Sequence, residues 1–282
     1  MNQQTLVCFE TYGKTTRRAQ SLSQMEPVMP WERLCALFKP HYPKGGKSVG
    51  DRPPVPLDLG RERVPDETVV CKFRHLLEKH KLGERLFKAV TRHARARGIK
   101  VSRGTIVYVS IISSPGSTKS WSGERPPAMH QTTKGKQWLS GIKAHISGVS
   151  KEKIIHSVKA SGATVSESPA LLPHLLHGKE TQVYGNLLYR GQADVIHRCV
   201  SRATDSTNRR DRYSGQVDET ERRKNRTKSK IRSRVERACR EIKGLSGLTK
   251  ARYQGLAKNL RRQQTLCALA NLFTVRRHLL AG

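Results

Sequence analysis

A single acidic residue lies among basic residues in a charged segment near the carboxyl end of the chain. Arg232, Glu236, Arg240 and Lys243 recur every three or four residues, so they share one stripe of a helix predicted over residues 218–243. An apolar stripe lies roughly 100° around the same helix: Ile231, Val235, Ala238 and Ile242. The charged stripe is either a solvated ladder of ion pairs or one carboxylate of a metal site that faces a phosphate backbone.

The net charge favours a polyanionic partner. The 282 residues include 54 Lys and Arg against 22 Asp and Glu, a formal charge of +32. The densest basic stretch, residues 209–234, is either a solvated or disordered segment or a tract that binds nucleic acid by releasing counterions. An RNA-binding or ribosomal protein would explain the charge too. Aromatic residues make up only 5% of the chain, which argues against the common RNA-binding modules.

Nothing in the sequence predicts export or membrane insertion. No run approaches the ~18 apolar residues that a spanning helix needs, and the first residues lack the pattern of a signal peptide. We therefore predict a cytoplasmic protein without a membrane partner. The six cysteines are far apart and lack metal-binding spacing, so they are predicted to be reduced packing residues.

Helices are predicted in the first third of the chain. The segment from Met25 to Leu37 is predicted to carry a short amphipathic helix entered through Pro30, and a loop rich in Pro and Gly follows it. Asp66 is predicted to cap the next helix, and Gly83 to interrupt the pattern before another helix that ends at Gly98. Two helices joined by a short turn are typical of a helix-turn-helix or, more often, of a simple packing unit.

Strand-like sequence begins near residue 104. Residues 105–112 are almost continuously β-branched or apolar, which predicts a strand buried on both faces of a sheet. Shorter strands are predicted at 142–146, 154–158 and 181–184. Residues 197–217 show neither helical nor strand periodicity and are predicted to be poorly ordered. This order indicates an α/β domain.

Several segments carry a family resemblance. In chain order they are MEPVMPWERLCALFKPHYPKGG, VPDETVVCKFRHLLEKHKLGERLF, GTIVYVSIISSPGSTKS, MHQTTKGKQWLSGIKAHI, IRSRVERACREIKGLSGLTKARYQGLAKN and ALANLFTVRRHLL. Together they resemble the DDE transposases of bacterial insertion sequences, in the group typified by insertion sequence five. The spacing of Arg232, Glu236 and Lys243 is similar to the family's Y-R-E-K signature, with Ser229 in place of the Tyr.

The resemblance implies a ribonuclease-H-like mixed sheet with flanking helices, preceded by a small, shortened helical domain. Such enzymes cut transposon ends and join the freed 3′-hydroxyl to target DNA with two divalent metal ions, Mg²⁺ or Mn²⁺. The implied partners are double-stranded DNA and a second transposase chain, in a homo-oligomer or a mixed oligomer. The expected divisions are a flexible arm (1–24), a helical domain (25–100, shortened near 56–57) and the transposase domain (101–282) with a poorly ordered basic insert (197–217).

The sequence departs from the family at two of three acidic positions. The resemblance places Tyr108 and Asn186 where the family has Asp, and only Glu236 remains, so the implied metal site is incomplete. A phenol is neutral at pH 7, and an amide carries no charge. Three other acids are conceivable substitutes: Asp194, Asp205 and Glu180. We do not expect them to serve, because a ligand must be placed within fractions of an ångström.

We therefore expect a DNA-binding transposase with impaired catalysis. The alternative is a non-enzymatic DNA-binding protein that occupies transposon ends or inhibits active transposase in mixed oligomers. The expected DNA contacts are Arg232, Lys243, Lys250 and Arg252, with Lys134, Lys136 and Lys143 as second choices. Trp138 and His145 are predicted to be packing residues.

Overall fold

The computed structural model describes most of the chain. The described residues are 20, 23–42, 66–99, 104–114, 129–134, 137–163, 171–253 and 255–281. Nearly all of the predicted arm (1–24), the predicted shortening near 56–57 and Cys8 lie outside them.

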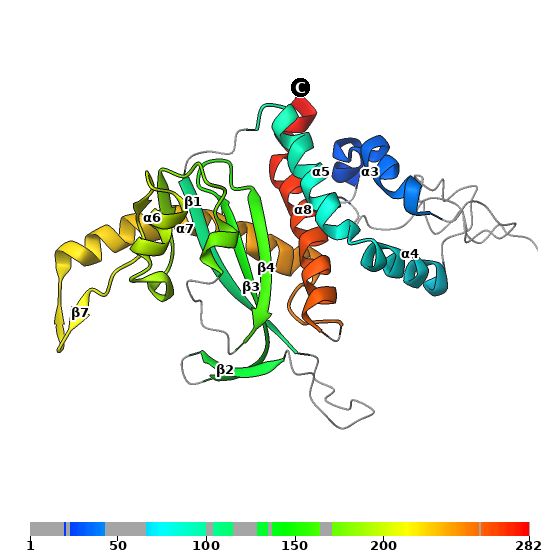
Figure 1. The fold of residues 1–282 in the computed structure, drawn as a ribbon. Helices are drawn as coiled ribbons and strands as arrows, with labels where there is room; N and C mark the ends of the chain where they lie inside the picture. Colours follow the sequence, from blue (N-terminus) through cyan, green and yellow to red (C-terminus); the bar gives the residue numbers. More distant parts are fainter. Residues whose placement is uncertain are drawn as a thin grey trace, which may run out of the picture.

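A six-stranded mixed sheet forms the centre of the molecule (Figure 1). Its strands are β1 (Gly104–Ser113), β2 (His130–Lys134), β3 (Gln137–Val149), β4 (Ile155–Gly162), β5 (Gln182–Tyr184) and β6 (Thr204–Asp205). β3 pairs antiparallel with β1, β2 and β4, whereas β1, β5 and β6 run parallel to one another. The predicted strands at 105–112 and 181–184 are confirmed, and so is the mixed α/β sheet.

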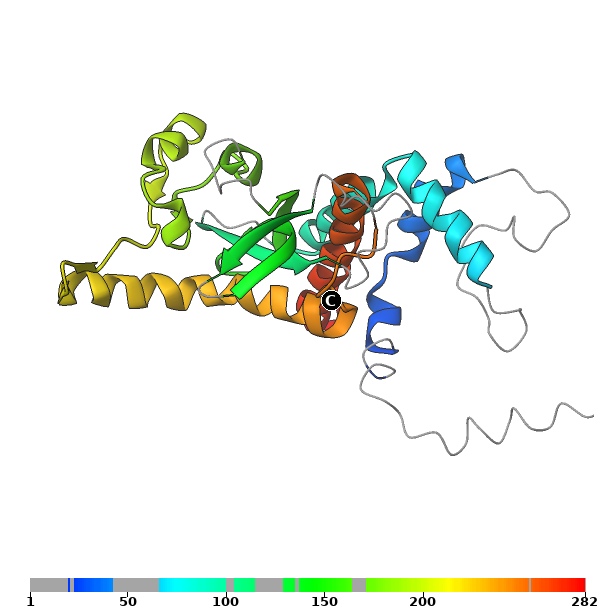
Figure 2. The same cartoon turned by 90° about the horizontal axis from the view of Figure 1, so that it is seen from below.

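Helices cover both faces of this sheet. Helices α7 (Glu219–Ser246) and α8 (Leu256–Ala281) lie on one face, while the short helices η5 (Leu172–Leu175), η6 (Leu187–Tyr189) and α6 (Ala193–Cys199) lie on the other. Figure 2 shows α7 running along its face of the sheet. Because side chains alternate along a strand, Tyr108 belongs to the face under α7 and Val107 to the opposite face. This alternation decides which residues can meet Glu236.

The predicted long helix is confirmed as α7. The Asp218 carboxylate caps it by accepting hydrogen bonds from the backbone N–H groups of Thr220 (2.9 Å) and Glu221 (3.0 Å). Val235 and Ile242 of the predicted apolar stripe are buried against the sheet. The stripe therefore sets the rotation of the helix and places Arg232 and Glu236 at its flank.

Three helices precede the sheet: α3 (Trp31–Phe38), α4 (Glu67–Lys79) and α5 (Leu82–Ala96). As predicted, the Asp66 carboxylate caps α4 by accepting from the Val69 N–H at 2.7 Å. The prediction that Gly83 interrupts the helices is wrong, because the break lies at Lys81, whose φ is 51°. Gly83 lies inside α5, where an added Cβ would come within 3.1 Å of the Arg261 carbonyl oxygen of α8. The glycine therefore permits close packing of the two helices.

The N-terminal helices share a hydrophobic core with the sheet. Leu34 of α3 and Leu82 of α5 are buried in the same cluster as Ile106 of β1 and Leu272 of α8. In Figure 1, α5 lies alongside α8. The two regions expected on either side of residue 100 are therefore packed together instead of having separate cores.

Residues 197–217 carry short elements, which differs from the predicted poor order. They include the end of α6, β6, and a hairpin of β7 (Arg212–Tyr213) and β8 (Gln216–Val217). Polar contacts attach the segment to α7: Asn225 accepts from the Arg209 N–H (3.1 Å) and donates to the Arg209 carbonyl (2.7 Å), and Asn208 donates to the Ser229 hydroxyl (3.2 Å). Such contacts leave no periodicity in the sequence.

Asn271 joins α8 to β4. Its side chain is 2% exposed, accepts from the Ile155 N–H and donates to the Ile155 carbonyl, both at 2.7 Å. We expect Asn271→Ala to lower the free energy of unfolding by ~3 kcal/mol, because both backbone groups lose their partner while buried. Urea denaturation measures the change. Asn225→Ala, which removes a similar pair of bonds at an exposed site, should cost under ~1 kcal/mol. Equal losses in the two variants would contradict this account.

In the described part of the chain, the cysteines form no disulfide, and no helix could span a membrane. The cysteines placed there are free thiols: Cys35, Cys71, Cys199, Cys239 and Cys267. None of the described helices is both long and apolar enough to cross a bilayer.

Candidate active site and nucleic-acid interface

The sheet face under α7 brings Tyr108 of β1 close to Glu236 of α7. Burial raises the pKa of Tyr108, and the nearby Cys239 thiol and Glu236 carboxylate add to the shift. The Ser110 hydroxyl and the Arg232 guanidinium oppose it. The phenol is therefore protonated at pH 7: it can donate a hydrogen bond, but it supplies no anionic oxygen.

The Glu236 carboxylate is already paired. The Arg232 Nε lies 2.9 Å from a Glu236 oxygen one helical turn away, and both side chains are partly buried. On the next turn, burial raises the pKa of the Cys239 thiol to about 12, against the effect of Lys243, so this thiol stays neutral at pH 7. Arg240 points into solvent. The structure thus contains the Arg232–Glu236 pair of the predicted ion-pair ladder.

Asn186 lies at the same level of the sheet as Tyr108. The parallel register pairs Ile106 of β1 with Tyr184 of β5, and each candidate residue follows two positions later. The Asn186 side-chain oxygen accepts a hydrogen bond from the Leu188 N–H at 3.2 Å and so caps η6. The three family positions therefore lie on β1, directly after the neighbouring strand β5, and on α7, and Tyr108 and Glu236 are close enough to interact electrostatically.

The three substitute acids do not converge with Glu236. Glu180 precedes β5, at the opposite end of that strand from Asn186; it is 1% exposed and accepts from the His177 N–H at 2.6 Å. Asp205 lies on edge strand β6, where it accepts from the Thr207 N–H. Asp194 is exposed on α6. Glu180 and Asp205 therefore have local roles, and none of the three acids is grouped with Glu236 in the described part of the chain.

The donor groups present do not fit a pair of divalent metal ions. Hard cations require several oxygen ligands, carboxylates above all. This centre offers one carboxylate, held by Arg232, beside a protonated phenol and an amide oxygen that caps a helix. Within the described ranges, no group of three or more His, Cys, Asp or Glu side chains is arranged to hold a metal ion. We derive no catalytic step through a metal here.

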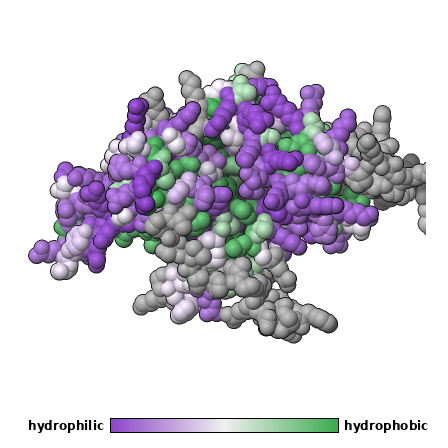
Figure 3. All heavy atoms as spheres, viewed as in Figure 1, coloured by the Kyte–Doolittle hydropathy of each residue, from purple (hydrophilic) through white to green (hydrophobic). Residues whose placement is uncertain are grey.

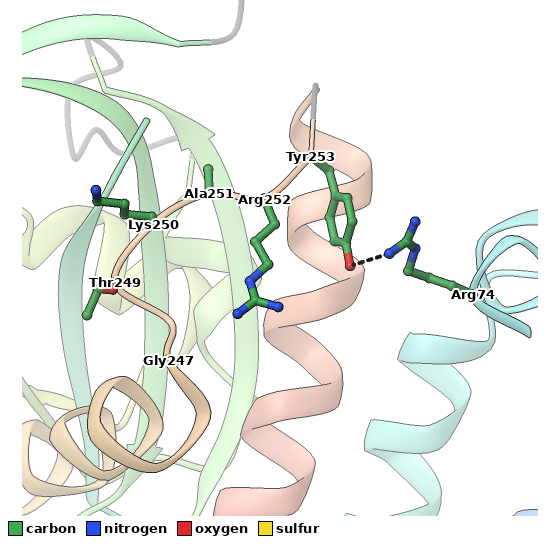
Figure 4. Close-up of a pocket in the computed structure, with 7 residues that line it drawn as sticks. All are labelled: Arg74, Gly247, Thr249, Lys250, Ala251, Arg252 and Tyr253. Atoms are coloured by element: carbon green, nitrogen blue, oxygen red, sulfur yellow. Dashed lines mark hydrogen bonds between the residues drawn. The ribbon is translucent and has the colours of Figure 1, made fainter. Parts of the chain in front are cut away.

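The expected DNA-contacting residues occupy two different places. Arg232 and Lys243 are partly buried on α7, where Arg232 binds Glu236. Lys250 and Arg252 are exposed on the loop that follows α7. This loop lines one side of an open cavity of about 640 Å³, and Arg74 of α4 lines the other side (Figure 4).

The second-choice residues of the β2–β3 hairpin are placed less favourably. Lys143 pairs with Ile111, so it lies on the sheet face away from Glu236. Lys136 and the Lys134 side chain lie outside the described residues. The prediction that Trp138 is a packing residue is wrong: it is 72% exposed, because the hairpin extends beyond the helices that cover the sheet (Figure 1). His145 is confirmed as a packing residue, fully buried with its ring 2.7 Å from the Ser161 hydroxyl.

A basic arm projects from the body of the protein. It consists of the first half of α7 and the β7–β8 hairpin, and hydrophilic side chains cover it in Figure 3. Its exposed basic residues are Arg209, Arg210, Arg212, Arg222, Arg223, Lys224, Arg226 and Lys230. The Arg210 guanidinium lies 5.5 Å from the centre of the Tyr213 ring. The dense charge seen in the sequence is therefore a solvated surface outside the core.

Two residues of the cavity were missed in the sequence. Arg74 of α4 donates to the Tyr253 hydroxyl at 3.4 Å, although 179 positions separate the two residues. Arg74 is one basic residue among many, and no spacing pattern connects it with Tyr253. Only the packing of α4 beside the loop brings them together.

Comparison with known proteins adds one family match. A family model described as a transposase DDE domain matches residues 102–272, more than half of the chain, and this range includes the three candidate positions Tyr108, Asn186 and Glu236. No solved structure matches the chain significantly.

Proposed function

Because the chain belongs to the DDE transposase family, we propose that it binds transposon and target DNA without supporting efficient strand cleavage. The family carries out DNA transposition, generally with divalent metal ions. One observation carries the proposal: the fold around the centre is well packed, while Tyr108 and Asn186 leave Glu236 as its single carboxylate, held by Arg232. The protein would keep the scaffold of a transposase and lack its metal ligands.

The topology supports a ribonuclease-H-like assignment for the proposed transposase domain, residues 101–282. The strand order β4–β3–β1–β5–β6 joins three antiparallel strands to two parallel ones, and helices flank both faces, as expected for the mixed sheet of that fold. The sequence motifs favour the group typified by insertion sequence five and a degenerate copy within it. Residues 25–100 would be the remainder of a shortened N-terminal helical domain, and the protein would act in the bacterial cytoplasm, on the nucleoid.

Two of the four expected DNA contacts are proposed to act outside the centre. Lys250 and Arg252 are exposed and do not depend on the missing carboxylates. Arg232 and Lys243 would contribute to the field beside Glu236. DNA affinity is therefore separable from cleavage.

A second role follows from this separation: the chain would occupy transposon ends or enter mixed oligomers with intact transposase and so inhibit it. The packed core and exposed basic loop favour this role, because a competitor needs binding without turnover. Expressing this chain beside an intact transposase should lower the transposition frequency. An unchanged frequency would remove the inhibitory role and leave the DNA-binding proposal intact.

The direct test uses the purified chain and duplex DNA from the ends of its element. We expect the DNA to be retarded in a gel, and its strands to stay intact in Mg²⁺ or Mn²⁺ as they do in EDTA. Glu236→Gln should change the affinity for the ends by less than about twofold, because the lost charge is already paired with Arg232. Metal-dependent cleavage of the ends would contradict the proposal.

A further inference from the structure

We propose that the cavity between α4 and the loop 247–253 is a binding groove for the phosphodiester backbone of DNA. Arg74, Lys250 and Arg252 would contact the phosphates, and Tyr253 would hold Arg74 in place. The groove deepens the proposed function and rests on it, because it assigns DNA to a surface shared by an N-terminal helix and the transposase domain. The cavity, of about 640 Å³, is larger than one phosphate needs and suits a stretch of backbone.

The loop that carries Lys250 and Arg252 is held in place. The Ser113 N–H of β1 donates to the Thr249 carbonyl at 3.1 Å, and the Ala251 N–H donates to the Ser113 carbonyl at 2.7 Å. Ala251 is buried, and in Figure 4 it points to the opposite side of the loop from Arg252. The two cations therefore extend from a fixed backbone, which lowers the entropy lost when an anion binds.

Arg262 of α8 also holds the same loop in place, through hydrogen bonds to its backbone. Its guanidinium donates to the Lys250 carbonyl at 3.1 Å and to the Gly247 carbonyl at 3.4 Å. Burial lowers the pKa of Arg262, and the nearby charge of Arg252 lowers it further. The effect of Arg252 on this pKa indicates that the two guanidinium groups lie close enough to repel each other. A bound anion would reduce that repulsion.

No acidic side chain of the described ranges pairs with the two exposed cations of the groove loop. Among the described residues, the side chains of Lys250 and Arg252 make no ion pair or hydrogen bond. Glu78 of α4 does not pair with them, because its Oε2 lies 3.8 Å from the Nζ of Lys258 on α8. A bound anion would supply the missing partner, and guanidinium groups bind phosphate through two hydrogen bonds.

Arg74 is positioned across the groove by Tyr253. Its guanidinium lies 4.8 Å from the centre of the Tyr253 ring and donates to the Tyr253 hydroxyl at 3.4 Å (Figure 4). The Arg74 Nε is shielded from solvent and has no hydrogen-bond partner in the described part of the chain. The Arg74 guanidinium therefore keeps hydrogen-bonding capacity that the described protein groups do not use.

Two elements, α7 and β1, connect the groove to the candidate centre. Its loop directly follows α7, the helix of Glu236, and pairs with the end of β1, the strand of Tyr108. A DNA strand held by the loop and Arg74 would therefore pass from the N-terminal helices towards that centre. This placement favours the backbone of a long duplex over a free phosphate group.

The test compares variants of the full chain on a 30-base-pair DNA duplex. Arg74→Gln and Arg252→Gln should each weaken binding about tenfold at 100 mM NaCl and reduce the slope of log affinity against log salt by about one. Arg202→Gln, at an exposed turn far from the groove along the chain, is the matched control and should leave both unchanged. Arg252→Lys keeps the positive charge, so its slope of log affinity against log salt should equal that of the natural chain.

Three results would overturn the proposal that the groove binds the DNA backbone. Wild-type affinity and slope in Arg74→Gln and Arg252→Gln would reject it while leaving DNA binding by the protein established. A loss confined to a 30-base-pair RNA duplex, or protection from heat by inorganic phosphate equal to that by DNA at the same ionic strength, would assign the site to another ligand. A wild-type chain that does not bind DNA would reject the proposed function itself. Thermal melting followed by circular dichroism checks that the variants fold.

Discussion

The double variant Tyr108→Asp/Asn186→Asp is expected to bind Mn²⁺ or Mg²⁺ at least ~100-fold more tightly than the natural chain. Tyr108 lies beside Glu236, and Asn186 follows the strand next to that of Tyr108, so the change would add two carboxylates around the single one now present. A net gain of only ~1.4 kcal/mol per added carboxylate, well below its gross attraction to a divalent ion, gives this factor. Isothermal titration calorimetry measures it, and the metal should also raise the Tm of the variant.

The matched control adds the same two charges elsewhere. Tyr213→Asp/Gln216→Asp places them on the exposed β7–β8 hairpin, away from Glu236, and should leave metal affinity near that of the natural chain. Equal gains in the two double variants would show a general effect of charge. A folded Tyr108→Asp/Asn186→Asp variant without metal binding would show that the loss of the site does not lie in these two replacements. Tight binding of two magnesium ions by the natural chain would overturn the account of an incomplete centre.

The free energy of unfolding is expected to fall by roughly 2–4 kcal/mol when the pH is lowered from 7 to 5. Burial lowers the pKa of His145 to about 4, with Lys143 adding to the shift. Burial also lowers the pKa of His156 to about 3, with His177 and Arg95 adding to it. Between these values and the ordinary pKa of 6.5, the unfolded chain takes up protons that the folded chain does not. Stability is therefore fully present above pH 6.5 and is lost as the pH falls towards the folded values.

Urea denaturation at a series of pH values measures this loss. His145→Gln keeps a hydrogen-bonding group near Ser161 and should remove up to about half of the pH dependence. His197→Gln, at an exposed position of α6, should leave it unchanged. A natural chain equally stable at pH 7 and pH 5 would contradict the burial of two neutral histidines.

Local sequence signals predicted much of the framework. Asp66 caps α4, the β-branched run forms β1, and the apolar stripe of α7 packs on the sheet. These predictions hold because caps and periodicity act over a few residues. The predictions for Gly83 and for residues 197–217 were wrong. The packing of Gly83 against Arg261 and the hydrogen bonds of residues 197–217 to α7 depend on residues distant in the chain.

The sequence alone determined the charge, the main helices and strands, and the residue types at the three family positions. The tertiary structure decided which of these residues meet. Strand alternation and register place Tyr108 on the sheet face under Glu236 and leave Lys143 on the other face. Helix packing brings Arg74 to Tyr253, and the reach of the hairpin exposes Trp138. The physical reason is that register and packing are set jointly by contacts across the whole core, whereas a sequence pattern records only neighbours along the chain.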